Sequence, residues 1–462
     1  MKVMKFGGSC LKNADDFELV ADIIQSEKED KVVVLSGVYG VTDRILNFLE
    51  ENYGEEDVTK FIEEIRKLHI EIGRKIIPCG NIFKETERRF GEKLKILERL
   101  LYGVHYVGEL TEKTRDLILS YGERFSVLLM EGLLRCKGLN ARALESEQVG
   151  LITDGNFGNA TADLPETERN LRLSILPLIR RGIVPIVTGF FGCDSRGKVT
   201  LFGRNGSDYS ASVIAYGVNA EIVEIWKDVE GFMSADPKFV EDAHFIDSLS
   251  YDEVAELAYF GARILHPRAV EPLKLKNIPM RIKNIYKREN PGTLIHATKK
   301  IWEGRVIKSV TYKEEIGSIK IYGAGVGSKP GVLGDITKYL SENRINIKSV
   351  ITSQTCITLL LEKEDVERSY RILSQKDIKT VERIEKVRGI SLVAIVGEGI
   401  LEYPGIAAKV FRAVASKGIN VEMFAAGASE VAFYFIIKKK YLKDAVEAIH
   451  RVFFGGNRDD KT

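Results

Sequence analysis

Short apolar runs recur along the first 295 residues of the chain, at 32–35, 183–187, 221–225 and 278–282. Strands buried on both faces of a sheet have this pattern. Between the runs the apolar positions follow helical spacing, as at residues 17, 20, 21 and 24, and Asn13 is the predicted N-cap of that helix. Residues 54–102 are charged with little strand signal, which predicts a helical excursion. The alternation predicts an α/β domain of three layers over residues 1–296.

A repeat organises the rest of the chain. Residues 319–363 and 393–437 align without a gap, and each anchor, such as Gly323 with Gly397, is offset by 74 residues. Each copy predicts a strand, a Gly/Pro turn, an amphipathic helix, two strands and a charged helix. We therefore expect two small domains, at 311–384 and 388–462, after a linker at 297–310.

Composition narrows the class of protein. The chain of 462 residues has 68 basic and 66 acidic side chains, a net charge of +2, which argues against a nucleic-acid partner. No apolar run reaches the ~18 residues of a membrane span, and the first residues do not resemble a signal peptide. The five cysteines show no CxxC spacing, which indicates a reducing cytoplasm rather than a disulfide framework or zinc site.

Glycines gather where strands are predicted to end, in KFGGS at 5–9, SGVYG at 36–40 and GRNGSD at 203–208. Such loops expose backbone N–H groups to anions, and Lys5 adds a positive charge. The planar guanidinium of Arg204 suits a carboxylate or a phosphate. Asp208 could cap the following helix or orient a catalytic lysine. Because the P-loop pattern is absent, the residues suggest phosphoryl transfer without a Walker motif, with the repeats as a regulatory tail.

Other motifs favour structural interpretations. The neighbours Glu123 and Arg124 fall in a helical stretch, where such pairs usually form a solvated face. Gly323 and Gly325 lack the third glycine of a dinucleotide fingerprint, so we interpret them as a strand-to-helix turn. His266 and Pro267 indicate the end of a helix. The histidines show no metal-ligand spacing.

Six segments, taken in order, resemble the motifs of the aspartate kinase family, which has an amino-acid-kinase domain and two C-terminal ACT domains. They are KFGGS at 5–9, Ser36 to Asp43, TDGNFG at 153–158, GRNGSDYSA at 203–211, WKDVEG to ADP at 226–237, and FGARILHP at 260–267. The resemblance covers nearly the whole chain. It implies a three-layer α/β kinase domain with a mostly parallel sheet, followed by two ACT-like, ferredoxin-like βαββαβ domains.

The resemblance also implies an activity: ATP-dependent phosphorylation of the side-chain carboxylate of L-aspartate to 4-phospho-L-aspartate, the first step towards lysine, threonine and methionine. It assigns catalytic roles to Lys5, Arg204 and Asp208. It assigns aspartate binding to Ser36, Thr42, Glu123 and Arg204. It assigns ATP binding to Lys5, Gly7, Gly8, Ser9, Lys227, Asp228, Phe232, Lys238 and Arg263. Mg²⁺ would bridge ATP oxygens, held mostly by phosphate and water rather than by protein ligands.

Four positions depart from the family pattern, all on the nucleotide side. Lys227 replaces a threonine, Phe232 a tyrosine, Lys238 an arginine and Arg263 a lysine. These changes keep open an ACT-type amino-acid sensor with an inactive kinase fold. A second alternative is another amino-acid kinase that acts on glutamate or N-acetylglutamate. The resemblance further implies lysine or threonine as effector and a homodimer or larger homo-oligomer formed through the ACT domains. Because no dehydrogenase portion follows residue 462, we expect no fused homoserine dehydrogenase.

Overall fold

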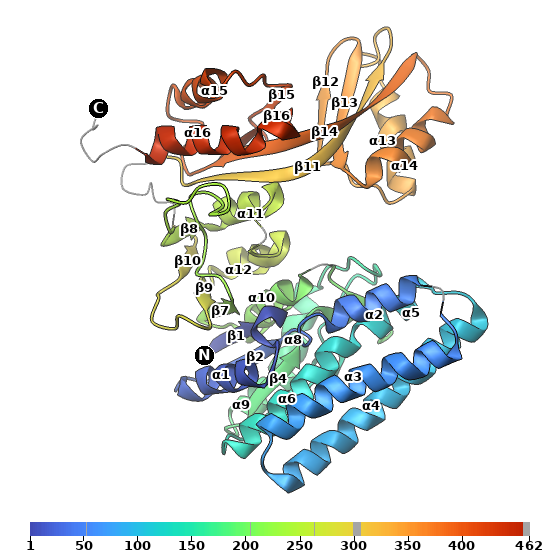
Figure 1. The fold of residues 1–462 in the computed structure, drawn as a ribbon, viewed down its shortest axis with the longest axis vertical. Coiled ribbons are helices and arrows are strands. Elements are labelled where there is room, and N and C mark those ends of the chain that lie inside the picture. Colours follow the sequence, from blue (N-terminus) through green and yellow to red (C-terminus); the bar gives the residue numbers. More distant parts are fainter. Residues whose placement is uncertain (52, 204, 263, 299–305, 456–462) are drawn as a thin grey trace. The chain divides into compact units, whose positions relative to one another are not determined.

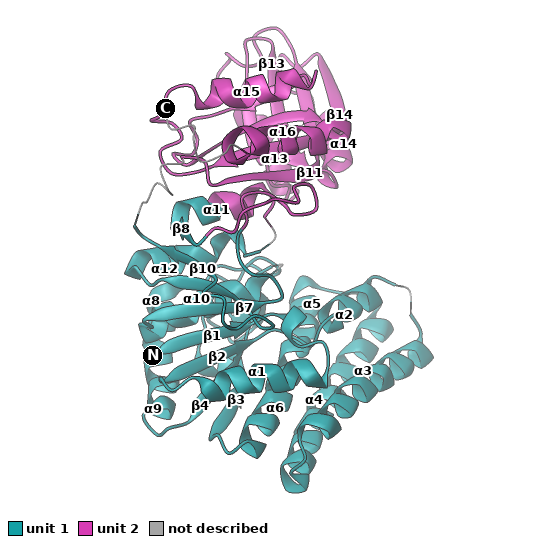
Figure 2. Cartoon of the chain, turned by 60° about the vertical axis from the view of Figure 1, so that its left-hand side comes forward, with its two compact units in different colours: residues 1–232, 247–255, 263–298 teal, residues 233–246, 256–262, 299–462 magenta. Residues whose placement is uncertain are grey.

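The computed structural model describes residues 1–51, 53–203, 205–262, 264–298 and 306–455. The chain forms two compact units, coloured separately in Figure 2. The first comprises Met1–Phe232, Asp247–Ala255 and Arg263–Thr298. The second comprises Met233–Ile246, Glu256–Ala262 and Lys299–Thr462. The predicted linker at 297–310 lies partly outside the described residues, and its last two residues already belong to a strand.

The first unit is built on an eight-stranded sheet with the order β3-β4-β2-β1-β7-β9-β10-β8 (Figure 1). Every neighbouring pair is parallel except β9 with β10. The strands are β1 (Lys2–Phe6), β2 (Lys31–Leu35), β3 (Ala141–Leu144), β4 (Val184–Thr188), β7 (Ile222–Lys227), β8 (Ser248–Ser250), β9 (Met280–Asn284) and β10 (Thr293–His296). The predicted α/β class with a mostly parallel sheet is confirmed.

The helices of this unit follow from the apolar pattern of the sequence. Asn13 caps the predicted first helix by accepting a hydrogen bond from the N–H of Asp16 at 3.0 Å. The longer helices are α1 (Ala14–Ser26), α2 (Val41–Glu50), α3 (Glu55–Ile76), α4 (Gly80–Val107), α6 (Tyr121–Cys136), α8 (Leu164–Ser174) and α10 (Gly206–Val218). The shorter ones are α5 (Glu112–Leu119), α7 (Ser146–Val149), α9 (Leu176–Ile179), α12 (Glu271–Lys276) and the 3-10 turns η1 (Gly8–Cys10) and η2 (Pro267–Val270). A two-stranded ribbon joins β5 (Phe191–Cys193) to β6 (Val199–Leu201).

Alternation along β1 assigns its side chains to opposite layers. Met4 and Phe6 belong to a core shared with α1, α3, α4 and α6. Lys5 points to the other face, where α10 packs against the sheet. The central strand thus places the charged side chain of Lys5 on the face of the sheet that α10 covers.

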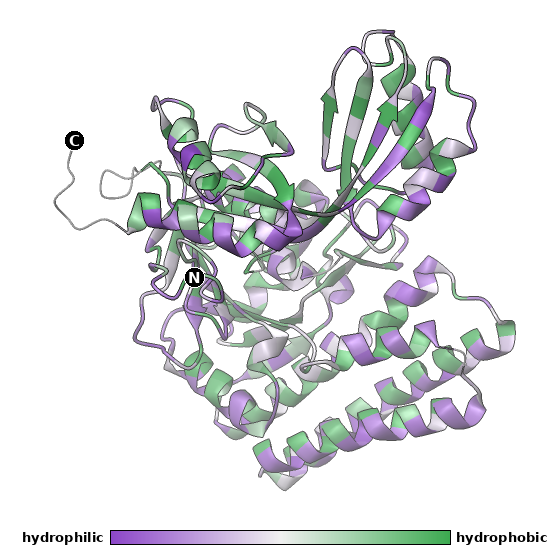
Figure 3. Cartoon of the chain, turned by 45° about the horizontal axis from the view of Figure 1, so that its top comes forward, coloured by the Kyte–Doolittle hydropathy of each residue, from purple (hydrophilic) through white to green (hydrophobic). Residues whose placement is uncertain are grey.

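The helical excursion predicted at 54–102 is the antiparallel hairpin of α3 and α4, along which hydrophilic and hydrophobic residues alternate (Figure 3). His69 of α3 is fully buried and contacts the rings of Phe90 and Phe125. The interpretation of His266 and Pro267 as a helix end is wrong. Helix α11 (Tyr251–Phe260) ends earlier, and His266 instead caps η2 by accepting from the N–H of Arg268.

The second unit holds the repeats in one six-stranded antiparallel sheet, with the order β12-β13-β11-β14-β16-β15 (Figure 1). Its strands are β11 (Ser309–Tyr322), β12 (Ser349–Thr352), β13 (Cys356–Glu362), β14 (Arg383–Val396), β15 (Met423–Ala425) and β16 (Ala432–Lys438). Its helices are α13 (Val332–Glu342), α14 (Asp365–Ser374), α15 (Ile406–Ser416), α16 (Leu442–Phe454) and the turn η3 (Lys439–Tyr441). Gly323 lies in the turn that follows β11, as the turn interpretation predicted.

The long strands β11 and β14 serve both repeats. Residues 318–322 of β11 pair with 383–387 of β14, and residues 309–313 pair with 392–396. The predicted boundaries at 311 and 384 therefore fall inside strands, because each copy completes its βαββαβ unit with part of a strand that begins or ends in the other copy. We propose that the copies divide near the register shifts between Lys313 and Ser318 of β11, rather than at a contiguous boundary.

Candidate functional site

The predicted site residues meet at the carboxyl ends of three neighbouring parallel strands. Gly7 and Gly8 follow β1, Ser36 follows β2, and Lys227 is the last residue of β7. Strand order reverses around β1, which lies between β2 and β7. Ligands of open α/β sheets bind at such a switch point, outside the carboxyl ends of the strands.

Asp208 joins two lysines at the centre of this edge. The Nζ of Lys5 is 2.5 Å from Oδ1 of Asp208, and the Nζ of Lys227 is 3.0 Å from Oδ2. Asp208 is fully buried, and the side chains of Lys5 and Lys227 are 4% and 14% exposed. Helix α10 begins at Gly206 after Asn205, so Asp208 lies inside the first turn and its carboxylate contacts lysines instead of capping.

Burial and neighbouring charges shift the pKa values of Asp208 and Lys5 in opposite directions. Burial raises the pKa of Asp208, but the ammonium groups of Lys227 and Lys5 outweigh it and hold the pKa at about 2. Burial lowers the pKa of Lys5; Asp208 counteracts this in part, and the charge of Lys227 lowers the pKa further. Asp208 is therefore ionised at neutral pH, and with both lysines protonated the three groups carry a net charge of +1.

The glycine loop after β1 packs closely against its neighbours. The N–H of Gly7 donates to the carbonyl of Trp226 at 3.2 Å, and the thiol of the buried Cys10 donates to the same oxygen at 3.2 Å. A Cβ added at Gly8 would lie 3.2 Å from the carbonyl oxygen of Gly37. Ser9 lies in η1 beside them. The loop thus approaches β2 and β7 through the backbone of Gly7 and Gly8 and the thiol of Cys10.

Glu123 in α6 is a buried carboxyl with one unused oxygen. Its Oε1 accepts a hydrogen bond from the N–H of Gly37 at 2.9 Å, and within the described part of the chain its Oε2 has no hydrogen-bond partner. Burial raises the pKa of Glu123 to about 8, although the bond from Gly37 and the charges of Lys5 and Arg124 oppose the shift. Once the carboxyl is ionised, this oxygen is suited to accept a hydrogen bond from a cationic donor.

The expectation that Glu123 and Arg124 form a solvated face is wrong, since both are 4% exposed. Arg124 forms ion pairs with Glu145 and, at 2.6 Å, with Glu147. Its guanidinium also lies 4.8 Å from the ring centre of Phe191. The pair is buried because α6 is surrounded on every side, and Arg124 anchors the first turn of the helix that carries Glu123.

Ser36 and Thr42 lie around Glu123 and Gly37. The Oγ of Ser36 is 2.7 Å from the Oγ of Ser207, and its carbonyl accepts from the hydroxyl of Ser126. A Cβ added at Gly122 would lie 2.7 Å from Oγ1 of Thr42, which shows how close this hydroxyl is to the start of α6. The four predicted aspartate-binding residues thus include three, Ser36, Thr42 and Glu123, that come together.

The residues predicted to bind ATP do not all lie at the strand ends. Asp228 follows Lys227 and lies 3.5 Å from the Nζ of Lys12. Phe232 is 1% exposed, and its N–H donates to Oγ1 of Thr293, so its ring offers almost no surface to a ligand. Lys238 belongs to the second unit. Arg204 and Arg263 lie outside the described residues.

Sequence reasoning did not identify the partners that position these groups. It missed the contact of Ser207 with Ser36, the hydrogen bond from Gly37 to Glu123, and the joint contact of Lys5 and Lys227 with Asp208. The glycine segments that contain Ser207 and Gly37 were visible signals. The pairing of β1 with β7 joins residues more than 200 positions apart, and the apolar pattern carries no information about it.

The described residues contain no group of three or more His, Cys, Asp or Glu side chains arranged to hold a metal ion. Both oxygens of Asp208 contact lysines, so this carboxylate is not free to act as a ligand. A divalent ion would fit here only through oxygens that a substrate brings.

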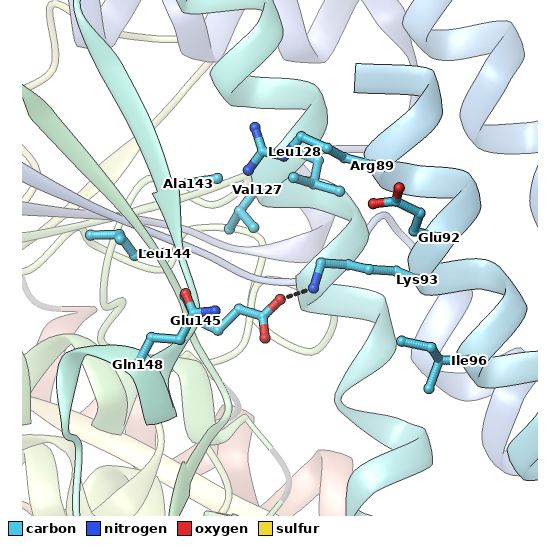
Figure 4. Close-up of a pocket in the computed structure, with 10 residues that line it drawn as sticks. All are labelled: Arg89, Glu92, Lys93, Ile96, Val127, Leu128, Ala143, Leu144, Glu145 and Gln148. Carbon is cyan, nitrogen blue, oxygen red and sulfur yellow. Dashed lines mark hydrogen bonds and ion pairs between the residues drawn. The ribbon is translucent and has the colours of Figure 1, made fainter. Parts of the chain in front are cut away.

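A cavity of about 270 Å³ lies apart from these residues, between α4, α6 and the end of β3 (Figure 4). The lining is Arg89, Glu92, Lys93, Ile96, Val127, Leu128, Ala143, Leu144, Glu145 and Gln148. Its cations are already paired, Arg89 with Glu131 and Lys93 with Glu145. None of the predicted site residues lines it.

Comparison with known proteins gives consistent matches. The model of the amino acid kinase family matches residues 1–284, and that of the ACT domain matches residues 319–376 and 393–453. The chain is 32% identical to aspartokinase 1, chloroplastic, of Arabidopsis thaliana, over 98% of this chain and 80% of that protein.

Two solved structures resemble the whole chain. The crystal structure of E. coli aspartokinase III in complex with aspartate and ADP (R-state) matches with a TM-score of 0.86 and 26% identity, over 98% of this chain and 100% of that one. The same enzyme in complex with lysine and aspartate (T-state) matches with a TM-score of 0.79 and 26% identity, over 98% and 99%. Across the described residues, no helix is long and apolar enough to cross a membrane.

Proposed function

The chain belongs to the aspartokinases within the amino acid kinase family, and we propose that it transfers the terminal phosphoryl group of ATP to the side-chain carboxylate of L-aspartate. A carboxylate oxygen forms a bond to the γ-phosphorus, and the bond from that phosphorus to the β–γ bridging oxygen breaks. The electron pair leaves with ADP, and the product is 4-phospho-L-aspartate. Because the acceptor is already ionised at neutral pH, no base has to remove a proton.

The observation that carries this proposal is the group formed by Lys5, Asp208 and Lys227 at the strand ends, where the charge of Lys5 also acts to lower the pKa of Glu123. Phosphoryl transfer depends on positioning and on neutralising the charge of the transferred group rather than on covalent chemistry. The two lysines and Asp208, beside the glycine loop, could both position the phosphoryl group and neutralise part of its charge.

For aspartate, we assign the unpartnered Oε2 of Glu123 to the substrate ammonium group. The hydroxyls of Ser36 and Thr42, both near Gly37, would donate to a substrate carboxylate. Arg204 takes the other carboxylate in this assignment, which rests on the resemblance.

For ATP, we assign the ammonium of Lys5, the glycine loop of Gly7 and Gly8 with the N–H of Gly8, and the hydroxyl of Ser9 to the phosphates. Lys227 and Asp228 continue this surface along β7. Phe232 would support the nucleotide from the interior, because its ring is buried. Lys238 and Arg263 stay predicted ATP contacts. Mg²⁺, when bound to the nucleotide, would supply further neutralisation of phosphate charge.

Regulation through the ACT repeats follows from the family. E. coli aspartokinase III has been solved with lysine, which supports lysine as an effector here, with threonine as the other candidate. Assembly into a homodimer or larger oligomer through the ACT sheets and a cytoplasmic location are further parts of the proposal. They would be tested by light scattering with and without each amino acid and by fractionation of the source cells.

One assay separates this function from its alternatives. The protein is incubated with MgATP, hydroxylamine and either aspartate, glutamate or N-acetylglutamate, and acyl phosphate is trapped as hydroxamate. We expect product with aspartate alone. Product from another acid would identify a different amino-acid kinase, and amino-acid binding without any product would identify a sensor.

The accompanying variant is Lys5→Ala. We expect loss of turnover, because the variant removes the ammonium nearest the glycine loop, with a circular dichroism spectrum unchanged from the parent. Retained turnover would remove Lys5 from the mechanism.

A further inference from the structure

We propose that Arg268 is a positioning residue for aspartate, which holds together two segments beside the aspartate end of the site. This inference rests on the proposed function. Arg268 lies in the turn η2, outside the residues assigned to aspartate and ATP. The first segment is residues 158–161, which begin at the last glycine of the TDGNFG motif, and the second is residues 201–203, which precede Arg204.

The guanidinium of Arg268 donates hydrogen bonds to both segments. Its Nη1 donates to Oγ1 of Thr161 at 2.9 Å. Its Nη2 is shared by three acceptors, namely Oδ1 of Asn159 at 3.1 Å and the carbonyl oxygens of Ala160 at 3.2 Å and Phe202 at 3.1 Å. All four acceptors are neutral oxygens, and a hydrogen bond from a charged donor is stronger than one between neutral groups. One side chain thus joins the two segments.

The two segments also contact each other directly. The N–H of Ala160 donates to the carbonyl of Leu201 at 2.8 Å. A Cβ added at Gly203 would lie 3.5 Å from the carbonyl oxygen of Gly158. The carbonyl of Gly203 accepts from the N–H of Gly206, the first residue of α10, at 3.0 Å. A shift of the first segment would therefore be passed to the turn between β6 and α10.

A second charged side chain contacts the same two segments. Asp116 in α5 is 1% exposed, and its Oδ2 accepts from the N–H of Gly158 at 2.8 Å and from that of Leu201 at 2.9 Å. Asp116 thus receives backbone N–H groups of both segments, while Arg268 donates to their oxygens. The opposite demands of a cation and an anion select one arrangement of the two segments.

Arg268 also contacts α10, the helix next to the aspartate residues. Its guanidinium lies 5.1 Å from the ring centre of Tyr209, whose hydroxyl accepts from the N–H of Ala162 at 3.3 Å. In the same first turn, Oγ of Ser207 lies 2.7 Å from Oγ of Ser36, which we assign to aspartate. The four hydrogen bonds of the guanidinium end on neither β1 nor β7, the strands that lead to the ATP residues. Loss of Arg268 should therefore affect aspartate rather than ATP.

A second interpretation is that Arg268 only fastens η2 to the fold. It predicts a lower melting temperature and parent kinetics wherever the protein is folded. The variant Arg268→Lys adds a further distinction, because lysine keeps the charge but carries a single nitrogen in place of the planar fork. One ammonium cannot occupy the places of both Nη1 and Nη2, so lysine should not restore the arrangement.

The experiment compares the parent with Arg268→Met and Arg268→Lys. The control is Arg281→Met, which removes from β9 an arginine that donates to the carbonyl of Pro291 in the same unit. Melting curves give a temperature at which every variant is folded, and steady-state kinetics are measured there. For both Arg268 variants we expect the KM of aspartate to rise about tenfold, the effect of losing one hydrogen bond from a charged donor. The kcat and the KM of ATP should stay close to the parent values, as should all three constants of the control.

Three results would overturn the proposal. The first is an unchanged KM of aspartate in folded Arg268→Met, and the second is an equal rise in the KM of aspartate and of ATP. The third is parent kinetics in Arg268→Lys, which would show that the charge is sufficient without the fork. If the parent forms no acyl phosphate from aspartate, the proposed function itself fails, and that result is distinct from any difference between the variants.

Discussion

The buried carboxyl of Glu123 predicts that aspartate binding depends on pH. Its pKa of about 8 means that the free protein holds this group protonated at neutral pH. A substrate ammonium at Oε2 requires the ionised form, so binding must expel the proton. The affinity for aspartate should therefore rise as the pH increases, and it should level off above about pH 8.

The magnitude follows from that pKa. About a tenth of Glu123 is ionised at pH 7 and about a hundredth at pH 6, and each pH unit below 8 costs about 1.4 kcal/mol of binding free energy. The apparent Kd of aspartate should thus be about tenfold weaker at pH 7 than on the plateau, and about 100-fold weaker at pH 6. About 0.9 proton should be released per aspartate bound at pH 7.

Titration calorimetry in buffers of different ionisation enthalpy measures both quantities. The Glu123→Gln variant should bind aspartate weakly. Its binding should release no proton, and the Kd of aspartate should not change between pH 6 and 8. The matched control is Glu92→Gln, which removes an exposed carboxylate on α4 that pairs with Arg88. An affinity that is constant from pH 6 to 8 in the parent, or binding without proton release at pH 7, would refute this account of Glu123.

Two further predictions concern His69 and Gly122. Burial lowers the pKa of His69 to about 4, so the unfolded chain binds a proton that the folded protein excludes; the free energy of unfolding should fall by about 3 kcal/mol as the pH drops from 6.5 to 4. Urea unfolding should show that His69→Phe, which fits among Phe90 and Phe125, loses less stability over this range than the parent, and an equal loss would contradict the assignment. A methyl group at Gly122 would lie 2.7 Å from Oγ1 of Thr42. Gly122→Ala should therefore raise the KM of aspartate several-fold with little effect on the KM of ATP, and steady-state kinetics showing both unchanged would contradict the role of Thr42.

The local pattern of apolar and polar residues was sufficient to predict most helices and strands of the fold. The runs at 32–35 and 183–187 became β2 and β4 with shifts of one residue, because burial on both faces leaves no polar position to break the pattern. The sharing of β11 and β14 by both repeats could not be predicted in this way. The internal repeat marks what the copies have in common, whereas residues 309–313 belong to neither aligned segment.

The site was predictable in its residue types and not in its contacts. A glycine next to a strand end indicated an anion loop, and the resemblance supplied roles for Lys5 and Glu123. The structural result that Asp208 bridges Lys5 and Lys227 depends on two strand pairings and on where α10 begins, none of which leaves a local signature. For the same reason the burial of Glu123 beside Arg124 was missed, since a helix surrounded on all sides does not show the amphipathic pattern that separates its faces.

The net charge of the whole chain conceals how the site is charged. The balance of +2 arises from 68 basic and 66 acidic side chains. At the ends of β1 and β7 the balance is different: Asp208 is ionised between two lysines, and Glu123 is neutral until a substrate ammonium arrives. The free site is thus positive, and each expected substrate contributes negative charge, aspartate through its carboxylates and ATP through its phosphates. Attraction to both arises from the ammonium groups of Lys5 and Lys227, of which Asp208 balances only one, and salt should screen the buried groups less than exposed charges.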